Sequence, residues 1–217
     1  MEKVVTESVK PSDRSHSSDG RSKSKRLLLA QQDQQIYVCD QIEELCMVFS
    51  SQIESCRQID VPVAVILIEV ANFEELKTID QESAAVLVNE TAHHLISVIR
   101  AQDILAQYSG KYIAVLLVDA NQDIGAKVCQ RIKESIHKFS YFHAGAAVLK
   151  LDFGVSDDSD NKYEELEHLI LSAAKALKIA HDRGEGAIVR TSELDPSKDS
   201  SEREHFFPGD RLTSKSD

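Results

Sequence analysis

The residues Ser109-Gly110-Lys111-Tyr112-Ile113 carry polar groups at a point where a turn would expose them. They lie between two apolar runs, ILAQY and AVLLV, and this pattern predicts a β-hairpin that turns at Ser109-Gly110. Acid catalysis or magnesium binding at such a turn would need carboxylates. The predicted turn instead carries a cation, Lys111, and a phenol, Tyr112.

A second set of candidate residues lies near the same hairpin. Arg100 and Asp103 form an R-x-x-D sequence just before it, and Arg131 follows in the next predicted helix. Guanidinium groups can bind a phosphate or the O6/N7 edge of guanine, and a carboxylate can accept hydrogen bonds from the guanine N1-H and 2-amino groups. The three side chains therefore suit an anionic purine ligand. The alternative is structural, with a surface salt bridge between Arg100 and Asp103 and a solvated Arg131.

Other reactive side chains favour no site. Cysteines 39, 46, 56 and 129 have no C-x-x-C spacing, so we expect buried free thiols and neither a metal site nor disulfides. His93 and His94 would point about 100° apart on a helix and could not bind one ion together. We expect the isolated histidines at 143, 168 and 181 to be solvated or packed. Tyr108 and Tyr112 could stack on a base, although tyrosines in strands usually pack in the core.

The apolar pattern of the chain predicts helices and strands that alternate around these residues. The expected order is helix, strand, helix, two hairpin strands, helix, strand, helix and strand, which indicates an α/β domain with a mixed sheet of about five strands flanked by helices, ferredoxin-like or palm-like. The helices are expected at 40–59 with Asp40 as N-cap, 73–99, 121–139 and about 165–183 with Gly184 as C-cap; the strands at 61–70, 104–108, 112–118, 141–149 and 186–190; and a polar loop at 152–162.

Composition divides the chain into a domain and two tails. Residues 1–33 are rich in serine and poor in apolar side chains, which predicts a disordered tail, and residues 1–26 carry a net charge of +3. Residues 34–190 form the predicted domain, and 191–217 a second disordered tail. The sequence Phe206-Phe207-Pro208 in that tail could be a docking peptide or a patch that folds back on the domain.

The overall charge and the length of the apolar runs exclude some classes of protein. A formal net charge of -11 argues against a DNA-binding protein, because such proteins usually carry a basic surface. The apolar run VPVAVILIEV has about half the length that a membrane span needs. We see no signal peptide after the basic residues near the start and therefore expect a cytoplasmic protein.

Over residues 33–190 the sequence resembles the GGDEF family of bacterial diguanylate cyclases, which join two GTP molecules into cyclic di-GMP on a palm-like fold. Residues 109–113, SGKYI, take the place of the GGDEF signature at the tip of the hairpin. Glu69 lies at the position of the family's metal-binding acid, and Phe73 at that of its phenylalanine. The sequence HAGAA matches S-x-G-x-A, with Gly145 on the glycine, and the sequence that ends at Gly184 matches the family's last helix.

The differences from the family pattern bear on catalysis. Phosphoryl transfer between two triphosphates needs divalent cations, which bind carboxylates. Of the family's acids only Glu69 is kept, and Lys111 would take the place of the metal's charge. The family's guanine-reading residues are replaced by Lys77, Thr78, Gln81, Glu82, Ala85 and Val86. We therefore expect no enzyme activity, no metal and no cofactor; the alternative is an altered enzyme in which Glu69 and either Asp119 or Asp123 hold a metal.

The residues Arg100, Asp103 and Arg131 match the inhibitory site at which family members bind their product cyclic di-GMP. The resemblance therefore implies a cyclic di-GMP receptor that regulates an unidentified partner protein. A homodimer is also implied, because the family works in pairs. The alternative is a scaffold that binds partner proteins without any nucleotide.

Overall fold

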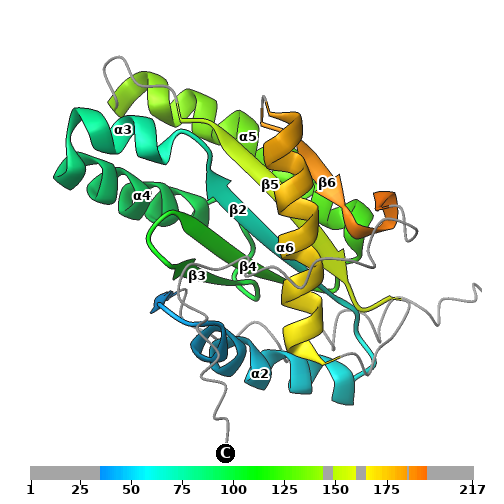
Figure 1. Cartoon of the computed structure of the whole chain (residues 1–217). Coiled ribbons are helices and arrows are strands. Elements are labelled where there is room, and N and C mark those ends of the chain that lie inside the picture. Colours follow the sequence, from blue (N-terminus) through cyan, green and yellow to red (C-terminus); the bar gives the residue numbers. More distant parts are fainter. Residues whose placement is uncertain (1–34, 144–148, 160–164, 185, 195–217) are drawn as a thin grey trace, which may run out of the picture.

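A six-stranded sheet with the order β1-β3-β4-β2-β5-β6 forms the centre of the computed structural model, which describes residues 35–143, 149–159, 165–184 and 186–194 (Figure 1). The strands are β1 (Ile36–Cys39), β2 (Val63–Val70), β3 (Ile104–Tyr108), β4 (Tyr112–Val118), β5 (Leu151–Asp157) and β6 (Ile188–Arg190). The helices are α2 (Ile42–Gln58), α3 (Phe73–Ile79), α4 (Gln81–Ile96), α5 (Gln122–His143), α6 (Leu166–Arg183) and the 3-10 helix η1 (Thr191–Glu193).

Strand β2 lies in the middle of the sheet and pairs antiparallel with both β4 and β5. Every residue of β2 is buried, as expected for an apolar strand with a helical layer on each side. The outer pairs, β1 with β3 and β5 with β6, are parallel. The predicted fold class, a mixed sheet flanked by helices, is therefore confirmed.

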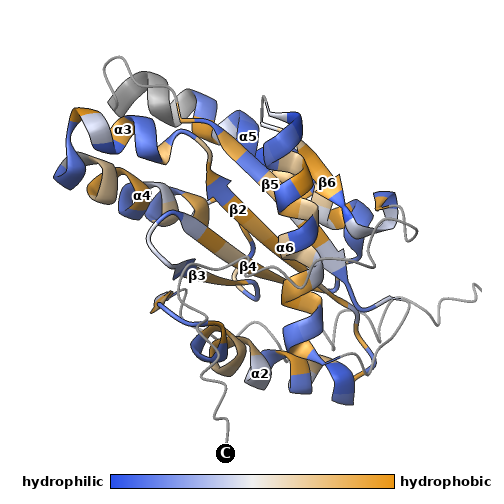
Figure 2. Ribbon diagram, viewed as in Figure 1, coloured by the Kyte–Doolittle hydropathy of each residue, from blue (hydrophilic) through white to orange (hydrophobic). Residues whose placement is uncertain are grey.

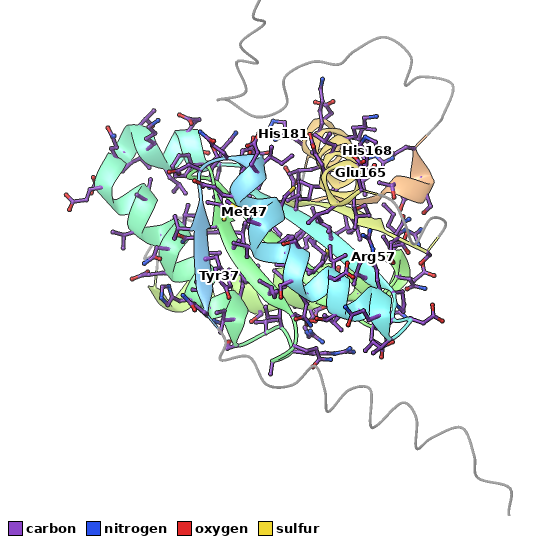
Figure 3. All side chains as sticks on the ribbon, turned by 90° about the horizontal axis from the view of Figure 1, so that it is seen from below. Tyr37, Met47, Arg57, Glu165, His168 and His181 are labelled. Atoms are coloured by element: carbon purple, nitrogen blue, oxygen red, sulfur yellow. The ribbon has the colours of Figure 1, made fainter. Side chains whose placement is uncertain are left out.

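Two helical layers cover the two faces of the sheet. Alternate side chains of β2 pack into different cores: Val65 and Leu67 face α2 and α6, whereas Ile66 and Ile68 face α3, α4 and α5. Figure 2 shows the apolar colour concentrated on the central strands. Figure 3 shows the molecule from the side of α2, where Met47 and Arg57 are labelled. Helix α6, with His168 and His181 labelled, lies on the same face of the sheet.

The hairpin that the sequence predicts is present. Tyr108 of β3 pairs with Tyr112 of β4, and both side chains are buried, so they pack in the core. Ser109 and Gly110 have φ angles of +46° and +80°, the left-handed conformation that tight hairpin turns need. Gly184 ends α6 with φ of +67°, which confirms the predicted C-cap.

The strand predicted at 141–149 is wrong. Helix α5 continues to His143, residues 144–148 with Gly145 lie outside the described residues, and the next strand is β5, within the segment predicted as a polar loop. The reason is the contact between β5 and α6. Gly154 lies so close to α6 that a Cβ at this position would be 2.1 Å from the backbone oxygen of Ala173, and the Ser156 hydroxyl donates to the Leu169 carbonyl.

Three smaller differences concern the ends of elements. Strand β1, a short strand at the edge of the sheet, was not predicted. The first helix begins at Ile42, and its N-cap is Gln41 and not the predicted Asp40. The backbone N-H of Asp40 instead donates a hydrogen bond to the Glu44 side chain. The helix predicted over 73–99 is two helices, and Asp80, in extended conformation, caps the second by accepting from the Glu82 N-H.

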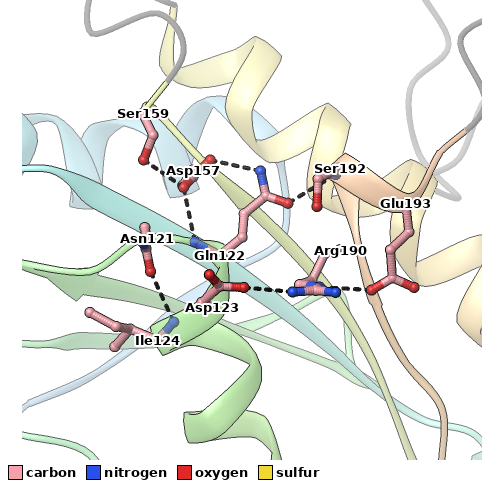
Figure 4. A network of polar contacts seen from close by, with 9 residues as sticks. All are labelled: Asn121, Gln122, Asp123, Ile124, Asp157, Ser159, Arg190, Ser192 and Glu193. Carbon is pink, nitrogen blue, oxygen red and sulfur yellow. Dashed lines mark hydrogen bonds and ion pairs between the residues drawn. The ribbon is translucent and has the colours of Figure 1, made fainter.

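A polar network holds the last described residues against the domain (Figure 4). Arg190 donates to Asp123 at 2.6 Å and to Glu193 at 2.8 Å. Gln122 makes two hydrogen bonds to Asp157 and accepts one from a backbone N-H of η1. The described structure therefore extends to Leu194, into the segment 191–217 predicted as a tail; the rest of that tail, with the Phe-Phe-Pro sequence, and residues 1–34 lie outside the described residues.

Candidate functional site

Two polar clusters lie at opposite ends of the β3-β4 hairpin. The turn at Ser109-Gly110 brings Lys111 to one end, where β2 also ends at Glu69 and Val70. At the other end, Asp103 precedes β3 and lies against Val118, the last residue of β4. We call the first group the tip cluster (Glu69, Lys111, Tyr112, Asp152 and His181) and the second the base cluster (Arg100, Asp103 and Arg131).

The sheet register aligns three residues of the tip cluster. Glu69 of β2 lies opposite Tyr112 of β4 on one side and Asp152 of β5 on the other. Lys111 Nζ is 2.6 Å from Glu69 Oε1, and His181 Nδ1, from the last turn of α6, is 3.3 Å from Glu69 Oε2 and 3.7 Å from Asp152 Oδ2. Two acids, a lysine and a histidine from four elements therefore meet at one edge of the sheet.

Burial and neighbouring charges shift the pKa of two side chains in this cluster, Lys111 and Asp152. Burial lowers the pKa of Lys111, but the hydrogen bond and charge of Glu69 outweigh it, so that the net shift is upward. Burial raises the pKa of the Asp152 carboxyl, despite hydrogen bonds from backbone N-H groups and the charge of His181. Lys111 is therefore held as a cation beside Glu69.

The tip cluster does not suit a divalent cation as it stands. Glu69 Oε1 is taken by the ammonium group and Oε2 faces His181, while Asp152 Oδ1 accepts the Ala187 N-H. The Lys111 ammonium group, 2.6 Å from that oxygen, competes with a divalent cation for it through its positive charge. Within the described ranges, no group of three or more histidine, cysteine or acidic side chains could hold a metal ion.

Asp152 and His181 were not predicted as members of this cluster. Asp152 was expected in a polar loop over residues 152–162 and His181 as an isolated histidine, whereas β5 places Asp152 opposite Glu69. His181 could not be found by spacing, because its acidic neighbours lie 112 and 29 residues earlier in the chain.

Replacement of Lys111 by methionine is expected to lower the free energy of unfolding by about 2 to 3 kcal/mol, since removing one partner of a buried ion pair leaves the other without compensation. The Glu69 side chain is only 7% exposed. Urea unfolding would measure the loss, and a second change, Glu69→Gln, should recover most of it. Lys77→Met is the control, because Lys77 pairs with Glu74 at 3.6 Å on the surface and should contribute less than about 0.5 kcal/mol. Equal losses for the two lysines would contradict the prediction.

Asp103 is the buried centre of the base cluster, with 7% of its surface exposed. Its Oδ2 accepts the Arg100 N-H at 2.9 Å and its Oδ1 accepts the Val118 N-H at 3.1 Å. Both carboxylate oxygens therefore fix the backbone, one in the turn before β3 and one at the end of β4. Both of these hydrogen bonds come from main-chain groups, and the first role of Asp103 is to shape the turn that carries Arg100.

The two arginines of the base cluster are exposed and act on the same carboxyl group. Burial raises the pKa of Asp103, while the two N-H donors and the positive charges of Arg100 and Arg131 lower it, with a net upward shift. Arg100 follows α4 and Arg131 lies on α5, so the three predicted residues come from separate elements, and both arginines are near enough for their charges to lower the pKa of Asp103. Two exposed guanidinium groups beside a buried carboxylate can bind phosphate or the edge of a purine.

The raised pKa of Asp103 predicts a pH effect of definite sign. The folded state holds this proton more tightly than the unfolded chain, so this contribution to stability is present at acid pH and is lost as the pH rises through the raised pKa. Relative to Asp103→Asn, which does not titrate, the unsubstituted protein should lose stability as the pH rises from about 4, the ordinary pKa of an aspartate, through the raised pKa of Asp103. Urea unfolding across this range tests it. Glu193→Gln is the control of opposite sign, because hydrogen bonds from Arg190 lower the pKa of Glu193; a flat difference for Asp103→Asn would contradict the prediction.

The other candidate residues lie apart from the two clusters. The cysteines are free; Cys39, Cys56 and Cys129 are buried, and burial raises the pKa of Cys46 to about 11 and that of Cys56 to about 12. Asp123 pairs with Arg190 and so does not lie with Glu69. His93 bonds to Asn89 of its own helix, whereas His94 bonds to Ser135 of α5. Among the described residues, no helix is both long and apolar enough to cross a bilayer.

Comparison with known sequences identifies the family of the chain. Residues 45–187 match the sequence model of the family described as "Diguanylate cyclase, GGDEF domain". The diguanylate cyclase DosC of Escherichia coli (strain K12) is 22% identical over 142 residues, which are 65% of this chain and 31% of that protein. The chain thus spans about a third of the length of the curated relatives it matches.

Solved structures share the fold. The active GGEEF domain of a diguanylate cyclase from Vibrio cholerae aligns with a TM-score of 0.62 at 16% identity, over 70% of this chain and 97% of that one. The GGDEF domain of DgcB from Caulobacter crescentus, solved in complex with c-di-GMP, aligns with 0.59 at 10% identity, over 84% and 99%. The diguanylate cyclase SiaD from Pseudomonas aeruginosa, solved with its activator SiaC, aligns with 0.59 at 17% identity, over 78% and 65%.

Proposed function

Because this chain belongs to the GGDEF family of diguanylate cyclase domains, we propose that it is a catalytically inactive member that acts as a receptor for cyclic di-GMP. In this proposal the ligand binds at Arg100, Asp103 and Arg131, and its binding changes how the protein meets a partner protein. The protein acts in the cytoplasm, where its free thiols stay reduced.

The observation that carries the proposal is the base cluster. The positive charges of Arg100 and Arg131, which come from two elements, both act on the buried carboxyl group of Asp103, and both arginines are exposed. Cyclic di-GMP carries two phosphates and two guanines, which are the groups that guanidinium and carboxylate bind best. Three or four charged hydrogen bonds of about 1.5 to 3 kcal/mol each would suffice for a micromolar site.

The proposed loss of catalysis rests on the tip cluster. Diguanylate cyclases need divalent cations beside the triphosphates, and Lys111 holds the Glu69 oxygen that would bind one. A fixed ammonium group offers a charge but no coordination positions, so it cannot bridge phosphate oxygens as a metal does. Asp152 adds a second carboxylate, but its Oδ1 accepts a backbone N-H.

Relatives support both halves of the proposed mechanism. The DgcB domain has been crystallised with c-di-GMP, so a domain of this fold can bind the ligand. The SiaD cyclase has been crystallised with its activator SiaC, so a member of the same fold can also engage a regulatory protein. We carry both properties to this chain as parts of the proposal, and a homodimer joined by the ligand is compatible with them.

Calorimetric titration of cyclic di-GMP into the purified chain tests the receptor, and incubation with GTP and Mg²⁺ followed by product analysis tests the loss of catalysis. We expect saturable binding in the micromolar range and no cyclic di-GMP product. The absence of binding to folded protein would overturn the receptor. Formation of product would overturn the inactive assignment and would point to Glu69 and Asp152 as metal ligands.

A second candidate function is a scaffold that binds a partner without nucleotide. It is favoured by two apolar side chains on the surface near the edge of the sheet, Val38 of β1, which is 72% exposed, and Met47 of α2, which is 68% exposed. The two functions differ in one test. A scaffold would bind its partner equally well with and without cyclic di-GMP, and Arg100→Ala would not alter that binding.

A further inference from the structure

A side-chain hydrogen bond joins α4, which ends shortly before Arg100, to α5, which carries Arg131. His94 Nε2, in the last turn of α4, is 2.6 Å from Ser135 Oγ of α5, and the contact is partly buried. His94 and Ser135 are 41 residues apart in sequence. The bond therefore fixes the distance between α4 and α5 at one point.

The path from His94 to Arg100 is short and held by hydrogen bonds. The His94 carbonyl accepts from both the backbone N-H and the hydroxyl of Ser97. The Leu95 carbonyl accepts from the N-H groups of Val98 and Ile99, and Arg100 then enters the turn that Asp103 fixes. A movement of His94 would therefore be passed on to the backbone of Arg100.

On α5, Ser135 lies four residues after Arg131 in an uninterrupted helix. Residues at this spacing lie on the same face, about 6 Å apart along the axis. The hydrogen bond from His94 thus meets α5 one turn from Arg131, on the side of the helix that carries it.

We infer that the His94-Ser135 hydrogen bond is a positioning device for the cyclic dinucleotide site, which sets the separation of the Arg100 and Arg131 guanidinium groups. This inference rests on the proposed function. A ligand that bridges two arginines binds best when their spacing is set before binding, since ordering them costs free energy. The site therefore includes His94 and Ser135 as positioning residues that need not touch the ligand.

The helices should remain packed without this bond, so the inference can be tested in folded variants. Apolar side chains of both helices, including Leu95 of α4 and Ile132 of α5, belong to the same buried core. Loss of one hydrogen bond should therefore leave the protein folded and shift only the fine spacing of the helices.

Calorimetric titration of cyclic di-GMP into five variants tests the inference, with the melting temperature of each measured in parallel. His94→Ala and Ser135→Ala should each bind three- to tenfold more weakly than the unsubstituted chain, and the double variant should be no weaker than either alone. His94→Gln, whose amide can still bond to the Ser135 hydroxyl, should restore binding to within twofold. His93→Ala is the matched control, because His93 bonds within its own helix.

The outcomes separate this inference from the proposed function. If Arg100→Ala loses binding while His94→Ala and Ser135→Ala bind normally, the receptor stands and the positioning device is wrong. If His94→Gln binds as weakly as His94→Ala, or if His93→Ala is equally impaired, the hydrogen bond is not the cause and the inference also fails. If the unsubstituted chain does not bind cyclic di-GMP, both fail.

Discussion

Arg100→Ala is expected to weaken cyclic di-GMP binding by about 30-fold or more. An arginine that grips a phosphate or a guanine edge makes two charged hydrogen bonds, and loss of about 2 kcal/mol from them corresponds to that factor. The backbone of the turn should survive, because Asp103 accepts the N-H of residue 100 and not its side chain. The loss should therefore appear in calorimetric titration without a matching fall in melting temperature.

Two further variants make this test specific. Arg183→Ala removes the same charge from an exposed arginine that pairs with Glu193 near the end of α6, outside the base cluster, and should bind as the unsubstituted protein does. Arg100→Lys keeps the charge but not the planar fork, so intermediate affinity is expected. An equal loss of affinity for Arg183→Ala would mean that the effect comes from the change in net charge. Normal binding by Arg100→Ala would mean that the ligand binds elsewhere.

Gly154→Ala is expected to lower the free energy of unfolding by about 3 kcal/mol or more, at the upper end of overpacking effects. A Cβ at this position would be 2.1 Å from the Ala173 carbonyl oxygen and 2.4 Å from the Leu177 nitrogen. Both atoms belong to the backbone of α6, so no side chain can rotate away to make room. Either α6 must move off the sheet or β5 must leave its register with β2.

The control for this prediction is a glycine with open space around it. Gly184, at the end of α6, has no atom within 4 Å of a built Cβ, and only its φ of +67° opposes a side chain. Gly184→Ala should therefore cost about 1 kcal/mol. Urea unfolding of both variants measures the difference. Similar losses at the two positions would show that α6 adjusts easily and that its contact with Gly154 is not tight.

The hairpin and the central strand were predictable because their signals are local. Val63–Val70 is almost wholly apolar, and this alone indicates a strand with a layer on each face. Ser109-Gly110 between apolar runs indicates a tight turn, and the positive φ angles at both residues agree with it. The sequence also identified three residues of the base cluster, which the fold brings to one place.

Strand β5 could not be predicted in the same way. It contains Asp152, Gly154 and Ser156, each of which is by its own propensity typical of a loop. In the folded chain Asp152 accepts a hydrogen bond from the Ala187 N-H, Gly154 allows α6 to approach, and the Ser156 hydroxyl donates to a carbonyl of α6. These residues form a strand only because α6 lies against them.

The sequence by itself therefore determined the class of fold and the hairpin, since apolar periodicity and turn residues act over a few neighbours. Only the tertiary structure decided that Asp152 and His181 join Glu69 and Lys111, and that His94 bonds to Ser135 between the helices that lead to the two arginines. Such contacts depend on strand register and helix packing, which place residues tens of positions apart within hydrogen-bonding distance. No local pattern in the chain encodes that distance.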